Sequence, residues 1–431
     1  MEINRRGLFK TAGAAAALTG LAACSAESES GTAAAPASSS TSAPAAPPAK
    51  SPAATLTGRV VRPADPDYGE ASAGWDLLFT HYPMVIVFAQ TTADVVNALT
   101  WARQNDVALR VRSGRHNLEG WSSVDNGIVI DVSELKSVQV DAAAKTATVG
   151  AGLNQMEAVT ALGKAGFAAP TGTEGTVGLV GATLGGGFGL LTRNFGMAAD
   201  NLLAAEIVVP TGVDGATAVK ADQSDNSDLL WALRGAGNGN FGIVTSMTYS
   251  IHPLTQTVYV NATWPGMSDL EAVFDAWQTS APATDNRLTS QLEVHSDRIL
   301  LVAALGSGTE DEAKRLLAPI LGVGTPAVTF QNADWADIYA GFQIPTADEP
   351  ANWKFFSQFM SEPLPAEALA VIRTMMSKAP TTDCNYFTNA FGGAVKNSEP
   401  SGGSAFAHRD ALFYAEPPEG CLLYTSDAAD E

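Results

Sequence analysis

The chain has 431 residues, of which 46% are hydrophobic and 16% are charged, enough for large buried cores and for two or three domains. Its 25 Lys and Arg residues are outnumbered by 45 Asp and Glu residues, which gives a formal net charge of −20 at pH 7. That balance argues against a nucleic-acid partner, because phosphate binding needs a basic face. Three cysteines are too few for a disulfide framework, and no Cys/His spacing predicts a metal site. A large acidic enzyme is the class that remains.

Residues 1–23 are expected to be an export signal. Arg5 and Arg6 begin a motif that resembles a twin-arginine signal, and a small-residue apolar run follows at 12–23. As a helix that run would rise about 18 Å, too short for a hydrocarbon core of about 30 Å. It ends in a sequence that resembles a bacterial lipobox, with Cys24 as the lipidated residue. The alternative is a chance pair of arginines before an alanine-rich run.

Twin-arginine export carries folded proteins, so the signal indicates an extracytoplasmic protein whose cofactor is loaded before export. A lipid anchor on Cys24 would be its only membrane attachment, the alternative being secretion. Residues 24–55 are rich in Ala, Ser and Pro and lack aromatic residues, which predicts a disordered tether.

The last eleven residues, 421–431, have no amphipathic period. They resemble a translated sequencing-library adapter, so we expect the natural chain to have been cut near Gly420. The alternative is a natural acidic tail.

The first part of the body, 56–254, predicts a mixed α+β domain. Thr92 or Asp94 is a candidate N-cap of its first long helix. Apolar runs and turn residues predict strands at 85–89, 107–112 and 128–132, a hairpin at 137–141 and 146–150, and helices at 94–102 and 152–161.

Two glycine clusters stand out, at 184–189 and 237–242. The second contains the spacing G-x-G-x-x-G, but a dinucleotide fingerprint must follow a strand and open a helix. Here a helical pattern precedes the glycines and a β-like run, 243–251, follows them. We therefore interpret the Rossmann match as false. The clusters either let backbone amides approach a pyrophosphate or only form tight turns.

His116 lies in the segment 112–117, directly after a predicted strand. A neutral imidazole can attack an electrophilic carbon without a separate base. The alternative is an ordinary histidine in a surface loop.

Together these motifs resemble the berberine-bridge-enzyme-like flavoprotein oxidases, which have the vanillyl-alcohol-oxidase (PCMH-type) FAD fold. The resemblance covers about 75–409. It is carried by 112–116, 119–121, 130–133, 149–152, 177–178, 184–189, 231–235 and 241–242.

The resemblance implies that FAD is bound and that His116 bonds covalently to the flavin 8α-methyl carbon. The implied cofactor-binding residues are Arg112, Ser113, Gly114, Arg115, His116, Asn117, Gly172, Glu174, Val177, Gly178, Gly181, Gly185, Gly186, Gly187, Gly189, Gly242, Ile243 and Val244.

Glu174 stands where many family members carry a cysteine that forms a second link to the flavin. A carboxylate cannot form that thioether, so we expect a single covalent link and, as a hypothesis, a narrower site or a milder oxidant. Glu174 is either a polar contact to the substrate or a solvated carboxylate. Val177 is small enough to leave the family's oxygen pocket beside the flavin, which favours an oxidase.

The second domain, 255–420, is expected to be an antiparallel sheet backed by helices that lines the substrate site. Strands with one wet face are predicted at 258–264 and 288–294, and an amphipathic helix at 310–321. The resemblance implies further strands at 391–395 and 405–409.

No catalytic base carries over from the family. Lys396 and Asn397 occupy the region in which plant members have a glutamate, and the C-terminal tyrosine of bacterial members falls beyond the expected cut. Glu293 and Tyr386 are the candidates for a base, and His295 and His408 are further candidate site residues, each of them equally plausible as an ordinary sheet residue.

The resemblance implies hydride transfer from an alcohol, sugar or amine carbon to flavin N5, with dioxygen as the acceptor and peroxide as the product. One alternative is a dehydrogenase that uses another acceptor. The other is a lipoprotein that binds a small molecule without turnover.

Overall fold

The computed structural model describes residues 52–343, 349–354 and 356–416. The predicted export signal, the lipidation site Cys24, most of the tether and the adapter-like tail lie outside these residues. Within them, none of the helices is long and apolar enough to cross a membrane.

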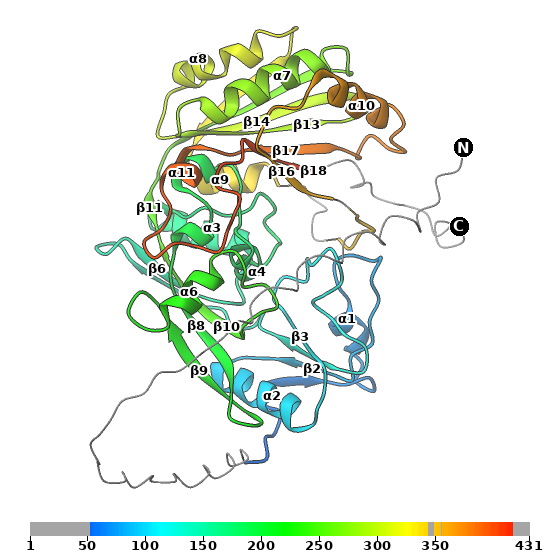
Figure 1. Ribbon diagram of the computed structural model, residues 1–431, viewed down its shortest axis with the longest axis vertical. Coiled ribbons are helices and arrows are strands. Elements are labelled where there is room, and N and C mark those ends of the chain that lie inside the picture. The colour runs from blue at the N-terminus through cyan, green and yellow to red at the C-terminus, as the bar shows by residue number, and fades with distance from the viewer. Residues whose placement is uncertain (1–51, 344–348, 355, 417–431) are drawn as a thin grey trace, which may run out of the picture. The chain divides into compact units, whose positions relative to one another are not determined.

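The first elements form a small sheet, and helix α2 connects two of its strands, β2 and β3 (Figure 1). Strand β4 pairs in parallel with both β2 and β3, while β1 pairs antiparallel with β2. The elements are β1 (Arg59–Val61), α1 (Tyr68–Ser72), β2 (Val85–Phe88), α2 (Thr92–Gln104), β3 (Leu109–Arg112) and β4 (Ile128–Asp131).

A five-stranded antiparallel sheet follows, in the order β5-β6-β10-β8-β9. Its strands are β5 (Val138–Asp141), β6 (Thr146–Gly150), β8 (Leu202–Thr211), β9 (Gly215–Ala221) and β10 (Ile243–Ser250). Between them come α3 (Gln155–Lys164), β7 (Phe167–Ala168), α4 (Leu179–Leu184), α5 (Thr192–Phe195) and α6 (Ser227–Leu233), and β11 (His252–Pro253) then pairs with β7. One apolar core joins both sheets and includes Val95, Ile130 and Ile207, each 0% exposed. This is the mixed α+β domain that the sequence predicts for 56–254.

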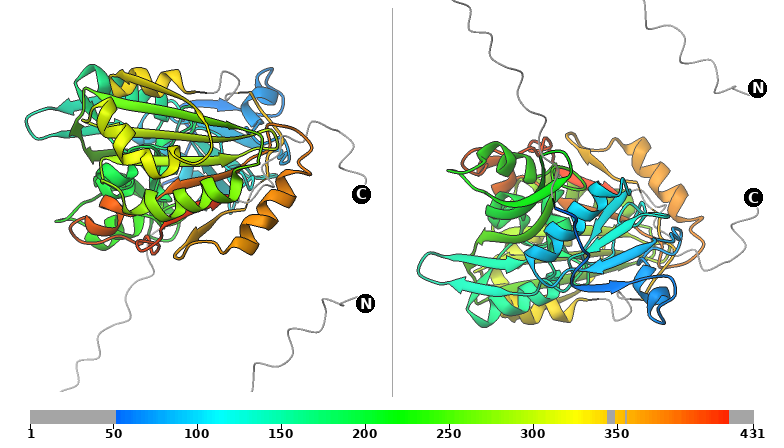
Figure 2. Two further views of the ribbon diagram at one scale, coloured as in Figure 1. Left: turned by 90° about the horizontal axis from the view of Figure 1, so that it is seen from above. Right: turned by 90° about the horizontal axis from the view of Figure 1, so that it is seen from below.

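The second domain is a seven-stranded antiparallel sheet, in the order β15-β12-β14-β13-β17-β18-β16. Its strands are β12 (Thr257–Pro265), β13 (Leu288–Val294), β14 (Arg298–Gly306), β15 (Ala327–Ala333), β16 (Gln358–Met360), β17 (Tyr386–Ala390) and β18 (Phe413–Glu416), and its helices are α7 (Leu270–Ser280), α8 (Glu310–Leu321), α9 (Trp335–Gly341), α10 (Ala366–Met376) and α11 (Gly393–Asn397). Helices α7, α8 and α10 cover one face of the sheet, as the ribbon shows from the front and from above (Figures 1 and 2). The α+β fold with an antiparallel sheet backed by helices is therefore confirmed, and we call this second domain the substrate domain after its expected role.

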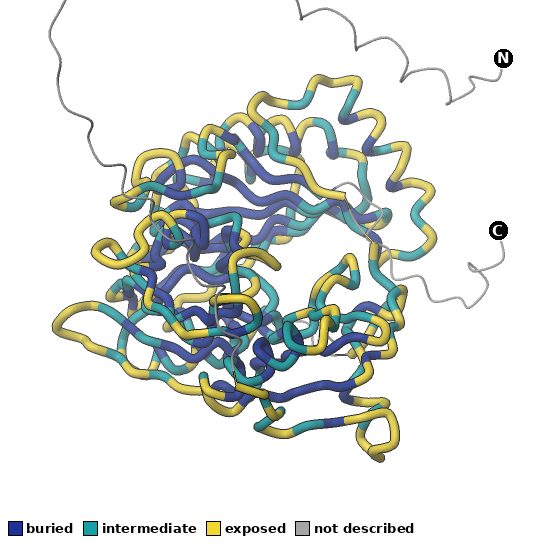
Figure 3. The backbone as a smooth tube through the Cα atoms, turned by 60° about the horizontal axis from the view of Figure 1, so that its bottom comes forward, coloured by how far each residue is buried: buried dark blue, intermediate teal, exposed yellow. Residues whose placement is uncertain are grey.

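The other face of this sheet packs on the first domain. Val302 and Ala304 of β14 share a cluster with Val159 of α3 and with Trp335 of α9. The central strands β13, β14 and β17 are accordingly buried along most of their length, and Figure 3 shows such buried stretches in the interior of the molecule and exposed backbone at its rim. The prediction of one solvent-exposed face for 288–294 is wrong, because all residues of β13 but one are buried. A strand between two layers has no solvent-facing side.

The start of α2 differs from the predicted caps. Thr91, one residue before the predicted candidates, is the N-cap, and its side chain accepts a hydrogen bond from the backbone N–H of Asp94. The Asp94 carboxylate in turn accepts from the backbone N–H of Thr91 at 2.9 Å. Asp94 is thus the third helical residue of a capping box and not the cap itself.

Two strands implied by the resemblance are absent from this part of the structure. Residues 391–395 run from an irregular turn into helix α11, and 405–409 form a loop within the described residues. Gly392 and Gly393 have φ values of 87° and 52°, a left-handed conformation that ends strand β17. The two segments lie at strand ends, beside β17 and β18.

Candidate functional site

The loop at 112–117 begins where strand β3 ends on a buried ion pair. Arg112 pairs in register with Asp131 of β4, and its Nε donates to Asp131 Oδ2 at 2.6 Å. Both side chains are at most 1% exposed. Burial lowers the pKa of Arg112, and the Asp131 carboxylate opposes that shift. The pair fixes the point at which the loop leaves the sheet.

The loop then passes very close to a second loop, at 172–178. A Cβ added to Gly114 would lie 2.2 Å from the backbone nitrogen of Gly178. Ser113 Oγ also donates to the carbonyl of Ala151 at 2.9 Å, at the start of the segment that leads into α3. Arg115 has a φ of 66°, the left-handed conformation found in backbone nests that bind anions. Only a residue without a side chain fits at position 114.

His116 is held between an aromatic ring and a hydroxyl. Trp75 stacks on the imidazole with ring centroids 5.1 Å apart, and Thr176 Oγ1 lies 3.0 Å from His116 Nε2. The backbone N–H of Trp75 donates to the carbonyl of Arg115, which keeps this ring beside the loop. Burial lowers the pKa of His116 to about 4, so the imidazole is neutral at pH 7. A neutral imidazole in a fixed orientation is a potential nucleophile.

The second loop is fixed by a buried glutamine at the start of α3. Gln155 accepts a hydrogen bond from the backbone N–H of Gly172, and its Nε2 donates to the carbonyl of Glu174 at 3.0 Å. The backbone N–H of Gln155 also donates to the carbonyl of Val177 at 3.0 Å. The loop that carries Glu174 and Val177 is therefore held from one side along most of its length.

The substrate domain holds the same loop from the other side. Gln343 accepts from the backbone N–H of Gly175 at 2.7 Å and donates to the carbonyl of Thr173 at 3.0 Å. Gln291 of β13 donates to Thr173 Oγ1 at 2.8 Å. The loop is thus a shared element of the two domains.

The other predicted glycines occupy packed backbone turns. A Cβ added to Gly189 would lie 2.4 Å from the carbonyl of Thr171, and one on Gly187 would lie 2.8 Å from Ala198. Gly185 faces the Asn238 amide in the same way, whereas Gly181 lies on an exposed helix surface with nothing within 4 Å. The two glycine clusters contact each other, since the N–H of Gly237 donates to the carbonyl of Leu184. Both interpretations of the glycine clusters, as backbone that approaches a pyrophosphate and as tight turns, fit these positions.

The predicted contact residues at the start of β10 lie deeper. Gly242 has a φ of 155° and leaves no room for a Cβ beside the carbonyl of Val208. Ile243 and Val244 are 2% and 4% exposed and belong to the apolar core. Only their backbone can contribute to a cofactor site.

The substrate sheet presents carboxylates and aromatic rings on the face opposite its helices. Glu293, Phe387 and Glu416 are aligned across three neighbouring strands. Glu293 Oε2 lies 3.1 Å from His295 Nε2, so the structure brings these two predicted residues together. Tyr414 donates its hydroxyl proton to Glu416 at 2.6 Å.

Burial, and then the charge of Glu293, raise the pKa of Glu416 to about 7. A carboxyl group with that pKa exchanges protons near neutral pH. Glu416 was not among the predicted site residues, because nothing in the sequence indicates which face of β18 meets the other domain.

Tyr386 and His408 do not join this group. Tyr386 is 3% exposed and packs against Phe274 of α7, with ring centroids 6.0 Å apart, on the helix side of the sheet. His408 stacks on Phe359 at 4.4 Å. The geometry gives neither residue a place beside Glu293.

Thr176, Gln155 and Gln343 were also missed by the sequence analysis. Thr176 lies inside a recognised motif, and its contact with His116 joins residues that are far apart in the chain. Gln155 follows the helix cap Asn154, and nothing in the sequence indicates its role, because its burial (2% exposed) and its hydrogen bonds to the loop appear only in the structure. Such contacts become visible only in three dimensions.

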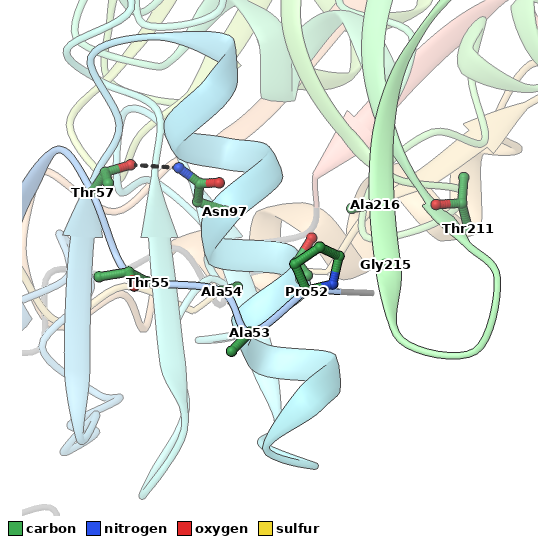
Figure 4. Close-up of a pocket in the computed structure, with 10 residues that line it drawn as sticks. Pro52, Ala53, Ala54, Thr55, Thr57, Asn97, Thr211, Gly215 and Ala216 are labelled. Carbon is green, nitrogen blue, oxygen red and sulfur yellow. Dashed lines mark hydrogen bonds between the residues drawn. The ribbon is translucent and has the colours of Figure 1, made fainter. Parts of the chain in front are cut away.

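A separate surface groove lies beside α2 (Figure 4). It is lined by Pro52, Ala53, Ala54, Thr55, Thr57, Asn97, Thr100, Thr211, Gly215 and Ala216. None of these ten residues is charged, and none is a predicted site residue.

The two loops fit a flavin dinucleotide. The glycines at 114 and 178 let the backbones of the two loops approach each other closely, and Nη1 of Arg112 is buried without a hydrogen-bond partner among the described residues. An anion at this loop would satisfy that donor.

Comparison with known proteins agrees with this interpretation. A sequence profile described as an FAD binding domain matches residues 83–213. The chain is 40% identical over 364 residues to "Uncharacterized FAD-linked oxidoreductase YgaK" of Bacillus subtilis (strain 168), covering 84% of this chain and 80% of that protein. It is 43% identical over 374 residues to "Uncharacterized FAD-linked oxidoreductase YvdP" of the same strain, covering 84% and 81%.

Two further relatives carry more specific names. "(R)-6-hydroxynicotine oxidase" of Paenarthrobacter nicotinovorans is 34% identical over 218 residues, which are 50% of this chain and 46% of that protein. The solved structure of Physcomitrella patens BBE-like 1 superposes with a TM-score of 0.77 at 26% identity and covers 84% of this chain and 81% of that one.

Proposed function

This chain belongs to the FAD-linked oxidoreductases, and we propose that it is an oxidase of a small hydroxylated or amine substrate. FAD, when bound, supplies the acceptor for a hydride from the substrate carbon that bears the oxygen or nitrogen. A protein base takes the proton of that heteroatom. Dioxygen then takes the two electrons, with two protons, and becomes hydrogen peroxide.

The position of His116 is the observation that carries the proposal. Its neutral imidazole is fixed by Trp75 and Thr176 at the meeting point of two glycine loops. We propose that it forms the single covalent bond to the flavin methyl group, because Glu174 cannot form a thioether. Val177 lies in the same loop and is proposed to leave room for dioxygen.

Glu416 is the proposed base, with Tyr414 as its hydrogen-bond partner. Its raised pKa, about 7, matches a group that must accept a proton near neutral pH. Glu293 and Phe387 beside it offer a negative charge and an aromatic ring, which suit a protonated amine or a sugar hydroxyl. One relative is named for 6-hydroxynicotine, which supports the amine class.

We also propose that the protein is exported folded by the twin-arginine route and anchored through a lipid on Cys24. The order of arginine pair, apolar run and cysteine supports this. Cell fractionation with labelled palmitate tests it. Label and membrane attachment that are both lost in Cys24→Ala support the anchor, and a wild-type protein without label contradicts it.

Acid precipitation of the purified protein tests the covalent flavin. We expect flavin absorbance in the pellet and flavin mass on the peptide that contains His116, both lost in His116→Ala. His81→Ala is the matched control, because His81 pairs with Asp125 in a different loop. Peroxide release under air during substrate turnover supports the oxidase. Turnover only with a quinone favours the dehydrogenase alternative, and a folded protein without any flavin favours a binding lipoprotein.

A further inference from the structure

Glu174 lies at one end of a hydrogen-bonded chain whose other end is His116. Thr176 Oγ1 lies 3.1 Å from Glu174 Oε1 and 3.0 Å from His116 Nε2. We propose that Glu174, acting through Thr176, is a positioning residue for the attachment of the flavin: it fixes the imidazole proton on Nε2 and then takes up that proton. This inference rests on the covalent link proposed above.

The direction of the two hydrogen bonds follows from the groups involved. A carboxylate only accepts hydrogen bonds, and a threonine hydroxyl has a single hydrogen to donate. When Thr176 donates that hydrogen to Glu174, its oxygen can only accept from His116. The imidazole must therefore carry its proton on Nε2, which leaves the lone pair on Nδ1.

The carboxylate is held in place independently of His116. The backbone N–H of Thr176 donates to the same oxygen, Glu174 Oε1, at 3.1 Å. The carbonyl of Glu174 is bound by Gln155. Glu174 thus reaches Thr176 from a fixed backbone, so the chain is already formed before any cofactor enters.

The other ring nitrogen is free to react. Among the described residues, His116 Nδ1 has no hydrogen-bond partner, and Trp75 stacks on the face of the ring. Stacking fixes the plane of the imidazole without occupying its nitrogen. In this geometry Nδ1 is therefore the nucleophilic atom of His116.

The bond-forming step balances with dioxygen as the oxidant. One C–H bond of the flavin methyl group and the Nε2–H bond of His116 break, and one N–C bond forms at Nδ1. The Nε2 proton passes to Thr176 while the Thr176 proton passes to Glu174. Dioxygen takes up two electrons and two protons in total and becomes hydrogen peroxide. Glu174 therefore holds the proton only in transit.

Selective 15N labelling of histidine tests the tautomer in the flavin-free full-length protein, prepared from riboflavin-starved cells. The chain has only 5 histidines, so His116→Ala identifies the relevant signals. We expect the Nε2–H tautomer in the wild type and a mixture of both tautomers in Thr176→Val. Glu174→Gln should retain the Nε2–H form, because its amide oxygen still accepts from Thr176. A wild-type Nδ1–H tautomer, or no change in Thr176→Val, overturns the proposal.

The rate of attachment tests the proton transfer. FAD is added to the flavin-free protein under air, and samples are acid-precipitated over time. We expect Thr176→Val and Glu174→Gln to attach flavin about a hundredfold more slowly, the usual contribution of a positioned proton acceptor. Thr176→Ser should restore a rate near that of the wild type. Unchanged rates in Thr176→Val or in Glu174→Gln overturn the proposed proton path.

Thr148→Val is the matched control for folding and for a lost hydroxyl, since Thr148 bonds Thr248 between β6 and β10. Thermal unfolding of each variant separates a defect in attachment from a defect in stability. If the wild type binds flavin but attaches none, the covalent link of the proposed function is wrong. The tautomer measurement still judges the Glu174–Thr176 pair in that case.

Discussion

Glu293 and Glu416 flank the same residue, Phe387, on neighbouring strands of the substrate sheet. Glu293 is bound by His295 and Asn385, whereas the described contact of the Glu416 side chain is the hydroxyl of Tyr414. Burial, and then repulsion by Glu293, keep a proton on Glu416 up to a pH of about 7. Two neighbouring carboxyl groups with different environments can divide the tasks of charge recognition and proton transfer.

Glu416→Gln is expected to remove the base while keeping the shape of the side chain. In the wild type, kcat/KM should rise as the pH rises through about 7, because Glu416 must lose its proton before it can accept one. The variant should lose this rise, and its kcat should fall about a hundredfold, the lower end of the usual contribution of a general base. Steady-state kinetics between pH 5 and 9 measure both effects. A variant that keeps the wild-type profile would assign the base elsewhere.

The same substitution, which should lower activity, should raise the stability of the fold. A carboxyl group whose folded pKa is raised from 4.5 to about 7 stabilises the fold only while it is protonated. Stability from this group is full below pH 4.5 and is lost as the pH rises through 7. Glu416→Gln should therefore raise the melting temperature more at pH 8 than at pH 5. An equal shift at both pH values contradicts the raised pKa.

Gly114→Ala is expected to separate the two cofactor loops. The new Cβ would lie 2.2 Å from the backbone nitrogen of Gly178, so one loop must move. We expect a less stable protein that retains little flavin after gel filtration. Gly69→Ala is the control, because Gly69 lies in helix α1 with nothing within 4 Å and alanine favours a helix by up to about 1 kcal/mol. Normal flavin retention in Gly114→Ala would show that the loops tolerate separation.

Periodicity predicted three elements of the substrate domain well, at 258–264, 288–294 and 310–321. Strand β13 and helix α8 have the predicted bounds, Leu288–Val294 and Glu310–Leu321. A period of two residues or of 3.6 residues is a local property, which the sequence displays directly. The strands expected at 391–395 and 405–409 rested on the resemblance and not on periodicity, and both are wrong. In the first segment, Gly392 and Gly393 turn the chain out of strand β17.

The site was only partly predictable, for a related reason. The residues of the two loops lie inside recognisable motifs, so Arg112, His116, Glu174 and Gly178 could be named in advance. The contact of Thr176 with His116 and the face of the sheet that Tyr386 occupies depend on how distant segments pack. A strand buried on both faces has no alternation to show which side meets the other domain.

Asp131→Asn is expected to leave a buried positive charge without its partner. Asp131 accepts from Arg112 Nε at 2.6 Å, and both side chains are at most 1% exposed. Removal of one partner of a buried ion pair costs about 3–5 kcal/mol. Urea denaturation measures the loss. Glu310→Gln is the control, since it breaks an exposed pair with Lys314 on one helix and should change the free energy of unfolding little.

Arg193→Lys is expected to weaken the junction between the two domains. Arg193 follows the glycine-rich loop at 184–189, and its guanidinium is almost completely buried. It donates to the carbonyl oxygens of Pro282, Thr284, Asp285, Leu288 and Phe391, all in the substrate domain. Burial lowers the pKa of Arg193 to about 10, so it stays charged at pH 7 and its hydrogen bonds are charge-assisted.

A lysine at this position keeps the charge but has three donors on one atom and cannot reach carbonyls on several sides. We expect a loss of about 3 kcal/mol in the free energy of unfolding, on the scale of one or two hydrogen bonds to a charged group. Arg110→Lys is the matched control, because Arg110 is exposed and binds the carbonyl of its neighbour Leu109. Limited proteolysis measures the separation of the two domains, which should increase in Arg193→Lys and not in Arg110→Lys. Equal stability of the two variants would mean that apolar packing between β14 and α3 holds the domains together without this residue.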